Sequence, residues 1–154
     1  MKSAVLSENG KYRYRLDRKW GKQAPIVWVM LNPSTADARK DDATIRRCCG
    51  FAKQWNAGGI VVYNLFAYRA TNPQELGGVP DPVGPKNDIH LAGIDPSLVV
   101  VCAWGVNGNH FTTRIRIVKR ILGNRDLWCL GLASGQPRHP GRIPYSTRLV
   151  RFKP

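Results

Sequence analysis

The chain has 154 residues, 43% of them hydrophobic and 22% charged, with 24 lysine and arginine residues against 10 acidic ones. This length predicts one domain over residues 1–154, and no apolar run approaches the roughly 18 residues of a membrane span. Met1-Lys2-Ser3 does not open a signal peptide, so we expect a cytoplasmic protein, monomeric and without a membrane partner.

The formal net charge of +14 is unevenly distributed. Residues 1–24 carry a net charge of +5, residues 25–113 are neutral, and residues 114–154 carry +9. If the two basic ends meet in space, they form one positive surface of the kind that binds nucleic acid, with DNA favoured over RNA. The alternative is a solvated cationic surface that serves solubility alone.

The four cysteines, at positions 48, 49, 102 and 129, include an adjacent pair but no C-x-x-C motif. We therefore expect free thiols, without a disulfide framework or a bound metal. Gly105 and Gly108 form only a fragment of the dinucleotide-binding fingerprint, and the chain has no Walker-type glycine loop. We expect no cofactor.

The first predicted element is a strand at residues 12–17. Polar and apolar residues alternate there with period two, which is typical of a half-exposed edge strand or hairpin. Residues 1–24 thus form a basic N-terminal strand region. The alternation places Arg13 and Arg15 on the outer face of the strand, where they are candidate phosphate contacts.

The next element is a run of six apolar residues from Ile26 to Leu31, which predicts a strand buried on both faces. Asn32-Pro33-Ser34 ends it, because proline cannot donate to a ladder and biases Asn32 away from helix. Ligands bind at such strand ends in α/β sheets. The alternative is a turn in which Asn32 and Ser34 only bond local backbone.

An amphipathic helix and a second strand follow. Asp41 and Asp42 offer an N-cap, apolar residues recur at helical spacing from Ile45 to Trp55, and residues 56–59 end the helix. A second apolar strand at 60–65 ends near Asn64. The segment 66–85 is rich in proline and glycine and predicts a long loop, which is more often functional than idle.

The second half of the chain predicts a short helix at 87–94, a strand at 97–104, a helix at 111–122, a strand at 126–130 and a loop at 131–144. Alternating strands and helices predict a three-layer α/β fold, with a four-stranded, mainly parallel sheet, helices on both faces and an N-terminal edge strand or hairpin. Right-handed crossovers then gather four loops at one edge of the sheet. These loops are 32–42, 64–85, 105–110 and 131–144.

Several strings carry a resemblance over nearly the whole chain. They are Leu31-Asn32-Pro33-Ser34-Thr35-Ala36-Asp37, Asp42-Ala43-Thr44-Ile45-Arg46-Arg47, residues 63–71 (YNLFAYRAT) and residues 135–140 (GQPRHP). These strings resemble the bacterial and phage family catalogued as domain of unknown function 1643. The family brings no assigned activity.

The order of the motifs is also similar to that of the uracil-DNA glycosylase superfamily, whose mismatch-specific branch has a Gly-Ile-Asn-Pro-Gly turn after its first core strand. Residues 31–34 (LNPS) occupy that place. Residues 61–64 (VVYN), followed by Arg69-Ala70, resemble the superfamily's strand that ends in a base-reading Asn, and His139-Pro140 resembles its late His-Pro loop. Ser34 replaces the motif's glycine, and no Ser-Pro follows Pro140.

This second resemblance implies an enzyme with a glycosylase-like fold that cleaves the N-glycosidic bond of a damaged or modified base. Asn32 would hold the attacking water through its side-chain oxygen, His139 would donate to the carbonyl oxygen of the leaving base, and Asn64 would read a Watson–Crick edge. Further candidate contacts to the base are Pro33, Ser34, Phe66 and Tyr68. Candidate contacts to phosphate are Arg13, Arg15, Arg69, Arg138 and Arg142.

Each assignment has a structural alternative. Asn64 is also explained as a strand-end residue bonding backbone, His139 as a surface-loop histidine and Phe66 as a core residue. Two other functions remain open for the whole chain: a non-catalytic module that binds nucleic acid or a nucleotide, and an enzyme acting on a free nucleoside or another small molecule. Binding of oligonucleotides with a steep salt dependence separates the latter from the rest.

Overall fold

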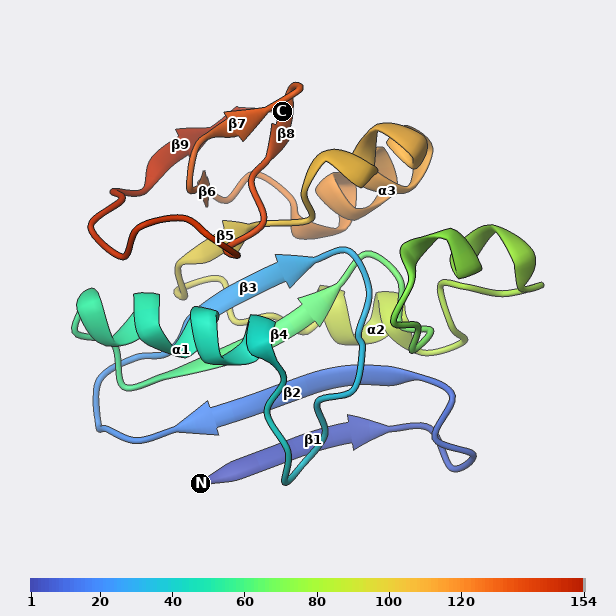
Figure 1. The fold of residues 1–154 in the computed structure, drawn as a ribbon, viewed down its shortest axis with the longest axis horizontal. Helices are drawn as coiled ribbons and strands as arrows, with labels where there is room; N and C mark the ends of the chain where they lie inside the picture. Colours follow the sequence, from blue (N-terminus) through green and yellow to red (C-terminus); the bar gives the residue numbers. More distant parts are fainter. Residues whose placement is uncertain (154) are drawn as a thin grey trace.

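The computed structural model describes residues 1–153, and its centre is one mixed β-sheet (Figure 1). The spatial order of the strands is β1 (Lys2–Leu6), β2 (Arg13–Lys19), β4 (Gly59–Asn64), β3 (Ile26–Met30), β5 (Val100–Cys102), β6 (Leu127–Cys129) and β9 (Val150–Phe152). The four central strands are parallel, and antiparallel strands extend both edges. The prediction of four strands is therefore wrong in number. The sheet has seven, because an N-terminal hairpin and a C-terminal strand add to the parallel core.

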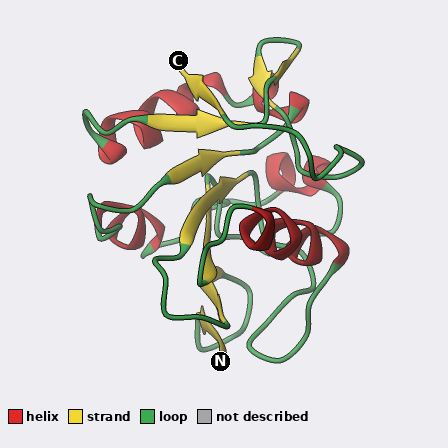
Figure 2. Ribbon diagram, turned by 90° about the vertical axis from the view of Figure 1, so that its left-hand side faces the viewer, coloured by secondary structure: helices red, strands yellow, loops and turns green. Residues whose placement is uncertain are grey.

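Helices cover both faces of the sheet (Figure 2). Helix α1 (Ala43–Gln54) packs on one face, and α2 (Asn87–Ala92) and α3 (Thr112–Leu122) pack on the other. Two short 3-10 helices, η1 (Pro73–Gly78) and η2 (Val106–His110), and a small hairpin of β7 (Leu132–Ala133) and β8 (Gln136–Pro137) occupy the connections. This is the expected α/β arrangement of helix, sheet and helix layers.

The central strand β3 divides the core into two parts. Val27 and Val29 join the cluster beneath α2 and α3, whereas Trp28 and Met30 join the cluster beneath α1. Alternate residues of a strand point to opposite faces, so a strand covered on both sides must be apolar throughout. This explains the unbroken apolar run in the sequence.

Helix α1 begins where the sequence indicates. The carboxylate of Asp42 accepts a hydrogen bond of 2.9 Å from the backbone N–H of Ile45, so Asp42 is the N-cap. Cys48, Phe51 and Ala52 bury the apolar face of the helix. Asn56 adopts a left-handed conformation, with φ of 57°, just past the end. The predicted cap and end are both confirmed.

The order of the parallel strands creates a place for ligands. The chain passes from β3 to its neighbour β4 and then returns across β3 to reach β5 on its other side. The connections that leave the carboxyl ends of β3 and β5 therefore turn toward opposite faces of the sheet. Ligands of open α/β sheets bind at such a switch point.

A β-bulge in β2 overturns the predicted orientation of Arg13. Val5 pairs with Arg15, but Leu6 pairs with Arg13, so Tyr14 is an extra residue without a partner in β1. The extra residue reverses the alternation at Arg13. Arg13 lies on the α1 side, is only 2% exposed, and donates a hydrogen bond of 3.0 Å to the carbonyl oxygen of Ala36. It is not the outward residue that period two predicts.

The two basic ends of the chain do not meet. β1 and β9 form the opposite edges of the sheet, which places the N-terminal and C-terminal segments at opposite ends of the molecule (Figure 1). Thus the single positive surface expected from both ends together is not formed. Any basic surface must be assembled from one end and the loops between.

The remaining sequence expectations concern cysteines and the membrane. All four cysteines lie within the described residues and are free, and three of them are buried. Burial raises the pKa of the Cys48 and Cys102 thiols, so both stay protonated. Within residues 1–153, no helix combines the length and the apolar character that crossing a bilayer requires.

Candidate functional site

A cleft of about 320 Å³ opens at the carboxyl ends of the parallel strands. All four loops expected at this edge contribute to its wall. The lining residues, grouped by loop, are Asn32, Pro33, Ser34 and Asp42 after β3; Asn64, Ala70, Thr71 and Pro73 at the end of β4 and beyond; Trp104, Gly105, Val106 and Asn107 after β5; and His139 after β8. Arg13, Met30, Leu31, Thr44 and Ile45 complete the wall. Asn32, Asn64 and His139 therefore share one cleft.

The amide of Asn32 joins two loops. Its Nδ2 group donates to the carbonyl oxygens of Ala70, at 2.7 Å, and Pro33, at 3.0 Å. The backbone N–H of Ala70 in turn donates to the carbonyl oxygen of Pro33 at 2.9 Å. Because both Nδ2 contacts are carbonyl oxygens, they fix which end of the amide is the donor. The acceptor Oδ1 is left free to bind a ligand or a water.

Asn64 is the last residue of β4, and its side chain is 2% exposed. Its Nδ2 is buried and has no hydrogen-bond partner among the described residues. The backbone around it is held firmly, since Asn87 Nδ2 donates to the carbonyl oxygens of Asn64, at 3.0 Å, and Leu65, at 3.1 Å. An unpaired buried donor costs free energy, typically about 1–3 kcal/mol. Its persistence at a cleft wall marks a position suited to binding an acceptor.

The hydrogen bonds of His139 determine the tautomer of its ring. The backbone N–H of Gly141 donates to Nδ1 at 3.0 Å. In the neutral ring the proton therefore resides on Nε2, which lies 3.4 Å from the hydroxyl of Thr44. His139 is exposed at the mouth of the cleft, yet partial burial lowers its pKa below the ordinary value, an effect that the carboxylate of Asp42 opposes more weakly. The ring is thus a neutral donor.

The loop that carries His139 is docked on α1 by Arg47. The guanidinium donates from Nε to the carbonyl oxygen of Pro140 at 3.0 Å and from Nη2 to the carbonyl oxygen of Ile143. It also lies 4.0 Å from the ring centroid of Tyr145. Gly50 permits this approach, since a Cβ there would meet the Tyr145 ring at 2.4 Å.

The other side of the same loop rests on the connection after β5. The backbone N–H of Gly105 donates to the carbonyl oxygen of Pro137 at 2.8 Å, and the indole of Trp104 donates to Gln136 at 2.8 Å. Gly105 has φ of 78°, and a Cβ at this position would reach within 3.4 Å of His139. His139 is therefore supported from both sides of the sheet edge.

Two opposite charges flank the cleft. The buried guanidinium of Arg13 has an unpartnered Nε, and burial lowers its pKa to about 10 while Asp42 acts in the opposite direction. Arg13 therefore stays positively charged at neutral pH. The carboxylate of Asp42 caps α1 and also lines the cleft. Sequence reasoning used Asp42 only as a cap and did not single out Thr44. Both residues belong to the Asp42–Arg47 string that carries the family resemblance, and this string was the signal that could have identified them as site residues.

Other predicted site residues lie outside the cleft wall. Phe66 is 4% exposed and packs edge-on against Phe111, with ring centroids 4.8 Å apart, so it lies in the core, as the structural alternative has it. Tyr68 packs instead against Tyr12, with ring centroids 6.0 Å apart. These two rings therefore belong to the packing of the domain.

The remaining predicted arginines are dispersed. Arg15 lies on the sheet face opposite Arg13 and forms an ion pair of 2.7 Å with Asp17, and Arg69 donates to the backbone oxygens of Ser34 and Gly10. Arg13 and Arg15 therefore do not share one face of the sheet. Two others, Arg138 and Arg142, are exposed in the His139 loop.

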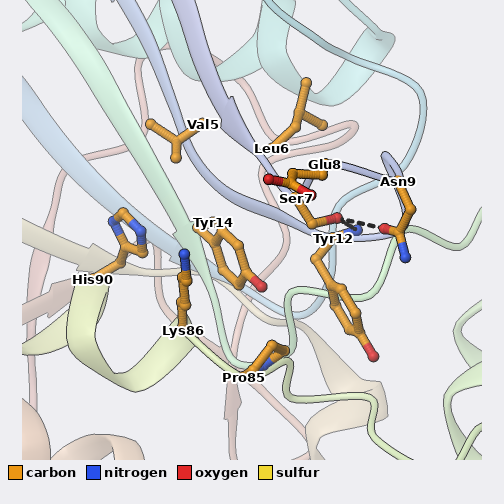
Figure 3. Close-up of a pocket in the computed structure, with 10 residues that line it drawn as sticks. All are labelled: Val5, Leu6, Ser7, Glu8, Asn9, Tyr12, Tyr14, Pro85, Lys86 and His90. Atoms are coloured by element: carbon orange, nitrogen blue, oxygen red, sulfur yellow. Dashed lines mark hydrogen bonds between the residues drawn. The ribbon is translucent and has the colours of Figure 1, made fainter.

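A second hollow, of about 450 Å³, lies between the β1–β2 turn and the start of α2 (Figure 3). Tyr14 stacks on His90 with ring centroids 5.2 Å apart, and Tyr12 lies parallel to Tyr14 at 6.2 Å. Among the described residues, no buried side-chain donor or acceptor without a partner lines this hollow, whereas Arg13 and Asn64 line the cleft. The cleft is therefore the stronger candidate site.

Within residues 1–153, histidine, cysteine and acidic side chains form no group able to hold a metal ion. A family model described as "Protein of unknown function (DUF1643)" matches residues 13–141. No curated protein and no solved structure matches the chain. The matched segment begins at Arg13 and includes every residue that lines the cleft.

Proposed function

The chain belongs to the DUF1643 family, and we propose that it is an enzyme that cleaves the N-glycosidic bond of a damaged or modified base in nucleic acid. One observation carries the proposal. Asn32, Asn64 and His139, which are 32 and 75 residues apart in the sequence, line one cleft at the carboxyl ends of parallel strands. The resemblance of their motifs to those of uracil-DNA glycosylases supports it.

Each of the three side chains offers an atom suited to one task. The free Oδ1 of Asn32 orients a water toward the anomeric carbon of the sugar, Nδ2 of Asn64 donates to an acceptor on the base, and Nε2–H of His139 donates to a carbonyl oxygen of the departing base. The bond between the sugar carbon and the base nitrogen breaks, and the base takes the electron pair. Water oxygen bonds to the sugar carbon, and its proton passes to solvent.

The charges around the cleft suit this reaction. An amide is not a general base, so the sugar must acquire much positive charge before water attacks. The carboxylate of Asp42 stabilises that positive charge. The guanidinium of Arg13 and the N-terminus of α1, which borders the cleft at Thr44, favour the negative charge that develops on the base.

The test is a screen of duplex and single-stranded oligonucleotides, each carrying one modified base, in which released base is detected as an alkali-sensitive strand break. We expect wild-type protein to release at least one base. Asn32→Ala and His139→Ala should each lower turnover by roughly 10²- to 10³-fold with binding nearly intact, as for groups that act mainly in the transition state.

Thermal melting of both variants controls for loss of the fold. Binding without base release from any tested oligonucleotide would contradict the proposal and favour a binding module. Release from free nucleosides but not from oligonucleotides would favour an enzyme of small molecules.

A further inference from the structure

The C-terminal third of the chain contains a basic groove outside the cleft, here called the α3 groove. It has a volume of about 320 Å³ and is lined by Thr112, Ile115, Arg116, Lys119, Leu132, Gly135, Gln136, Phe152 and Lys153. α3, the β7–β8 hairpin and β9 form it at the end of the sheet opposite the N-terminus (Figure 1). Three of its lining residues are cations and none is acidic.

The cations of the α3 groove are available to a partner. Arg116 and Lys153 are exposed, Lys119 is half-buried, and none of the three forms an ion pair with another residue of the described chain. Arg116 and Lys119 are three residues apart on α3, so their side chains share one face of the helix. Leu132, 57% exposed, adds an apolar rim. Three uncompensated cations around a groove fit a polyanion.

The α3 groove is connected to the cleft by a short stretch of chain. Gln136 lines the groove and His139 lines the cleft. Three residues span at most about 11 Å, and each strand of a duplex advances roughly 3.4 Å per nucleotide. A strand whose base enters the cleft therefore reaches the groove within about three nucleotides.

We propose that the α3 groove binds the phosphate backbone of a nucleic-acid strand, and that this is the strand whose base enters the cleft. The assignment of this strand to the base in the cleft rests on the proposed function, whereas binding of a phosphate backbone in the α3 groove does not. An acidic polypeptide would also complement the charge. The short stretch of chain between the groove, at Gln136, and the cleft, at His139, favours a nucleic acid.

The test measures fluorescence anisotropy of a labelled oligonucleotide against salt for wild-type protein and for the triple variant Arg116→Gln, Lys119→Gln, Lys153→Gln. Each phosphate contact contributes about 0.7–0.9 to the slope of log affinity against log salt concentration. We therefore expect the triple variant to lose roughly 2–3 from the magnitude of the slope. Poly-glutamate serves as a competitor.

The matched control removes the same charge from the other end of the molecule. Lys19, Lys22 and Lys53 are exposed near the amino ends of the parallel strands, away from the cleft. Their triple replacement by glutamine should leave the slope within about one unit of the wild-type value. An equal loss of slope in both triple variants would overturn the proposal that the α3 groove binds the backbone, because net charge alone would then explain binding.

Unchanged binding of the groove variant would also overturn the proposal, as would groove-dependent binding of poly-glutamate without groove-dependent binding of the oligonucleotide. Groove-dependent oligonucleotide binding without any base release would support the groove and count against the proposed reaction. Base release that does not depend on the groove would support the reaction and count against the groove. The two proposals therefore fail separately.

Discussion

Replacing Arg47 should release the His139 loop from α1 without unfolding the protein. Arg47→Met keeps the length of the side chain but removes the donors to the carbonyl oxygens of Pro140 and Ile143 and the cation over the Tyr145 ring. The net contribution of a hydrogen bond is about 1 kcal/mol, so the loss of both costs about 2 kcal/mol. The cation–π contact adds about 0.5 kcal/mol at a partly exposed site.

The sum, about 2.5 kcal/mol, corresponds to a roughly 60-fold increase in the equilibrium constant for release of the loop. Hydrogen exchange reports on this release at Gly141, whose backbone N–H is bonded to Nδ1 of His139 and exchanges once the loop loses its docked conformation. We expect its protection to fall by about that factor, while amides of the central strand β3 stay protected. Base release should fall as well, since His139 loses its fixed position.

Arg46→Met is the matched control, because Arg46 is the adjacent, exposed arginine on the same helix and does not contact the loop. Arg47→Lys keeps the charge but not the two-pronged donor geometry and should give an intermediate result. Unchanged protection of Gly141 in Arg47→Met would refute the reasoning. Equal loss of protection in β3 would show that Arg47 stabilises the whole fold.

Three further expectations concern the cleft. Asn64→Ala should reduce discrimination between bases more than it reduces turnover, because a site built around polar groups rejects ligands that leave those groups unpaired. The measurement compares the rates of base release from oligonucleotides that differ only in the target base. Equal rate losses on all bases would contradict this expectation. The pKa of the His139 ring, followed by NMR, should lie below the ordinary value of 6.5. Stability should therefore fall as pH drops through that range, since the unfolded chain then binds more protons than the folded chain; a midpoint at or above 6.5 would contradict this. Arg13→Met should change the free energy of unfolding in urea by no more than about 1 kcal/mol, because loss of the hydrogen bond to Ala36 is offset by removal of a buried charge. The same substitution should lower base release at least tenfold, whereas Arg15→Met, on the opposite face, is the control. A loss of stability above about 3 kcal/mol in Arg13→Met would show that Arg13 has a structural role.

The sequence predicted those elements whose burial shows in local periodicity. The apolar runs around Val29 and Val62 became β3 and β4, and the cap at Asp42 began α1 where expected. The loops at the carboxyl edge followed from the parallel pairing of the strands, which places Asn32 and Asn64 at the same edge.

Elements defined by tertiary pairing escaped prediction. β9 has three residues, two of them exposed, and is a strand only because it pairs with β6. The bulge at Tyr14 has no signature in the sequence, because any residue can be the extra one. As a result Arg13 was placed on the wrong face. Phe66 follows a buried strand directly and belongs to the core, which its aromatic character alone does not distinguish from a ligand contact.

The two hydrogen bonds from Asn32 to Ala70 and Pro33 also restrict which chemistry can evolve at this position. Aspartate has nearly the same shape and would be a stronger base, but its ionised carboxylate would face two carbonyl oxygens, acceptor against acceptor. The aspartate carboxyl would have to be protonated to donate a hydrogen bond to these carbonyl oxygens, and a protonated carboxyl is no longer a base. The backbone of two neighbouring loops thus fixes an amide at the centre of the cleft. A carboxylate base at this position would require rebuilding those loops, and one substitution would not suffice.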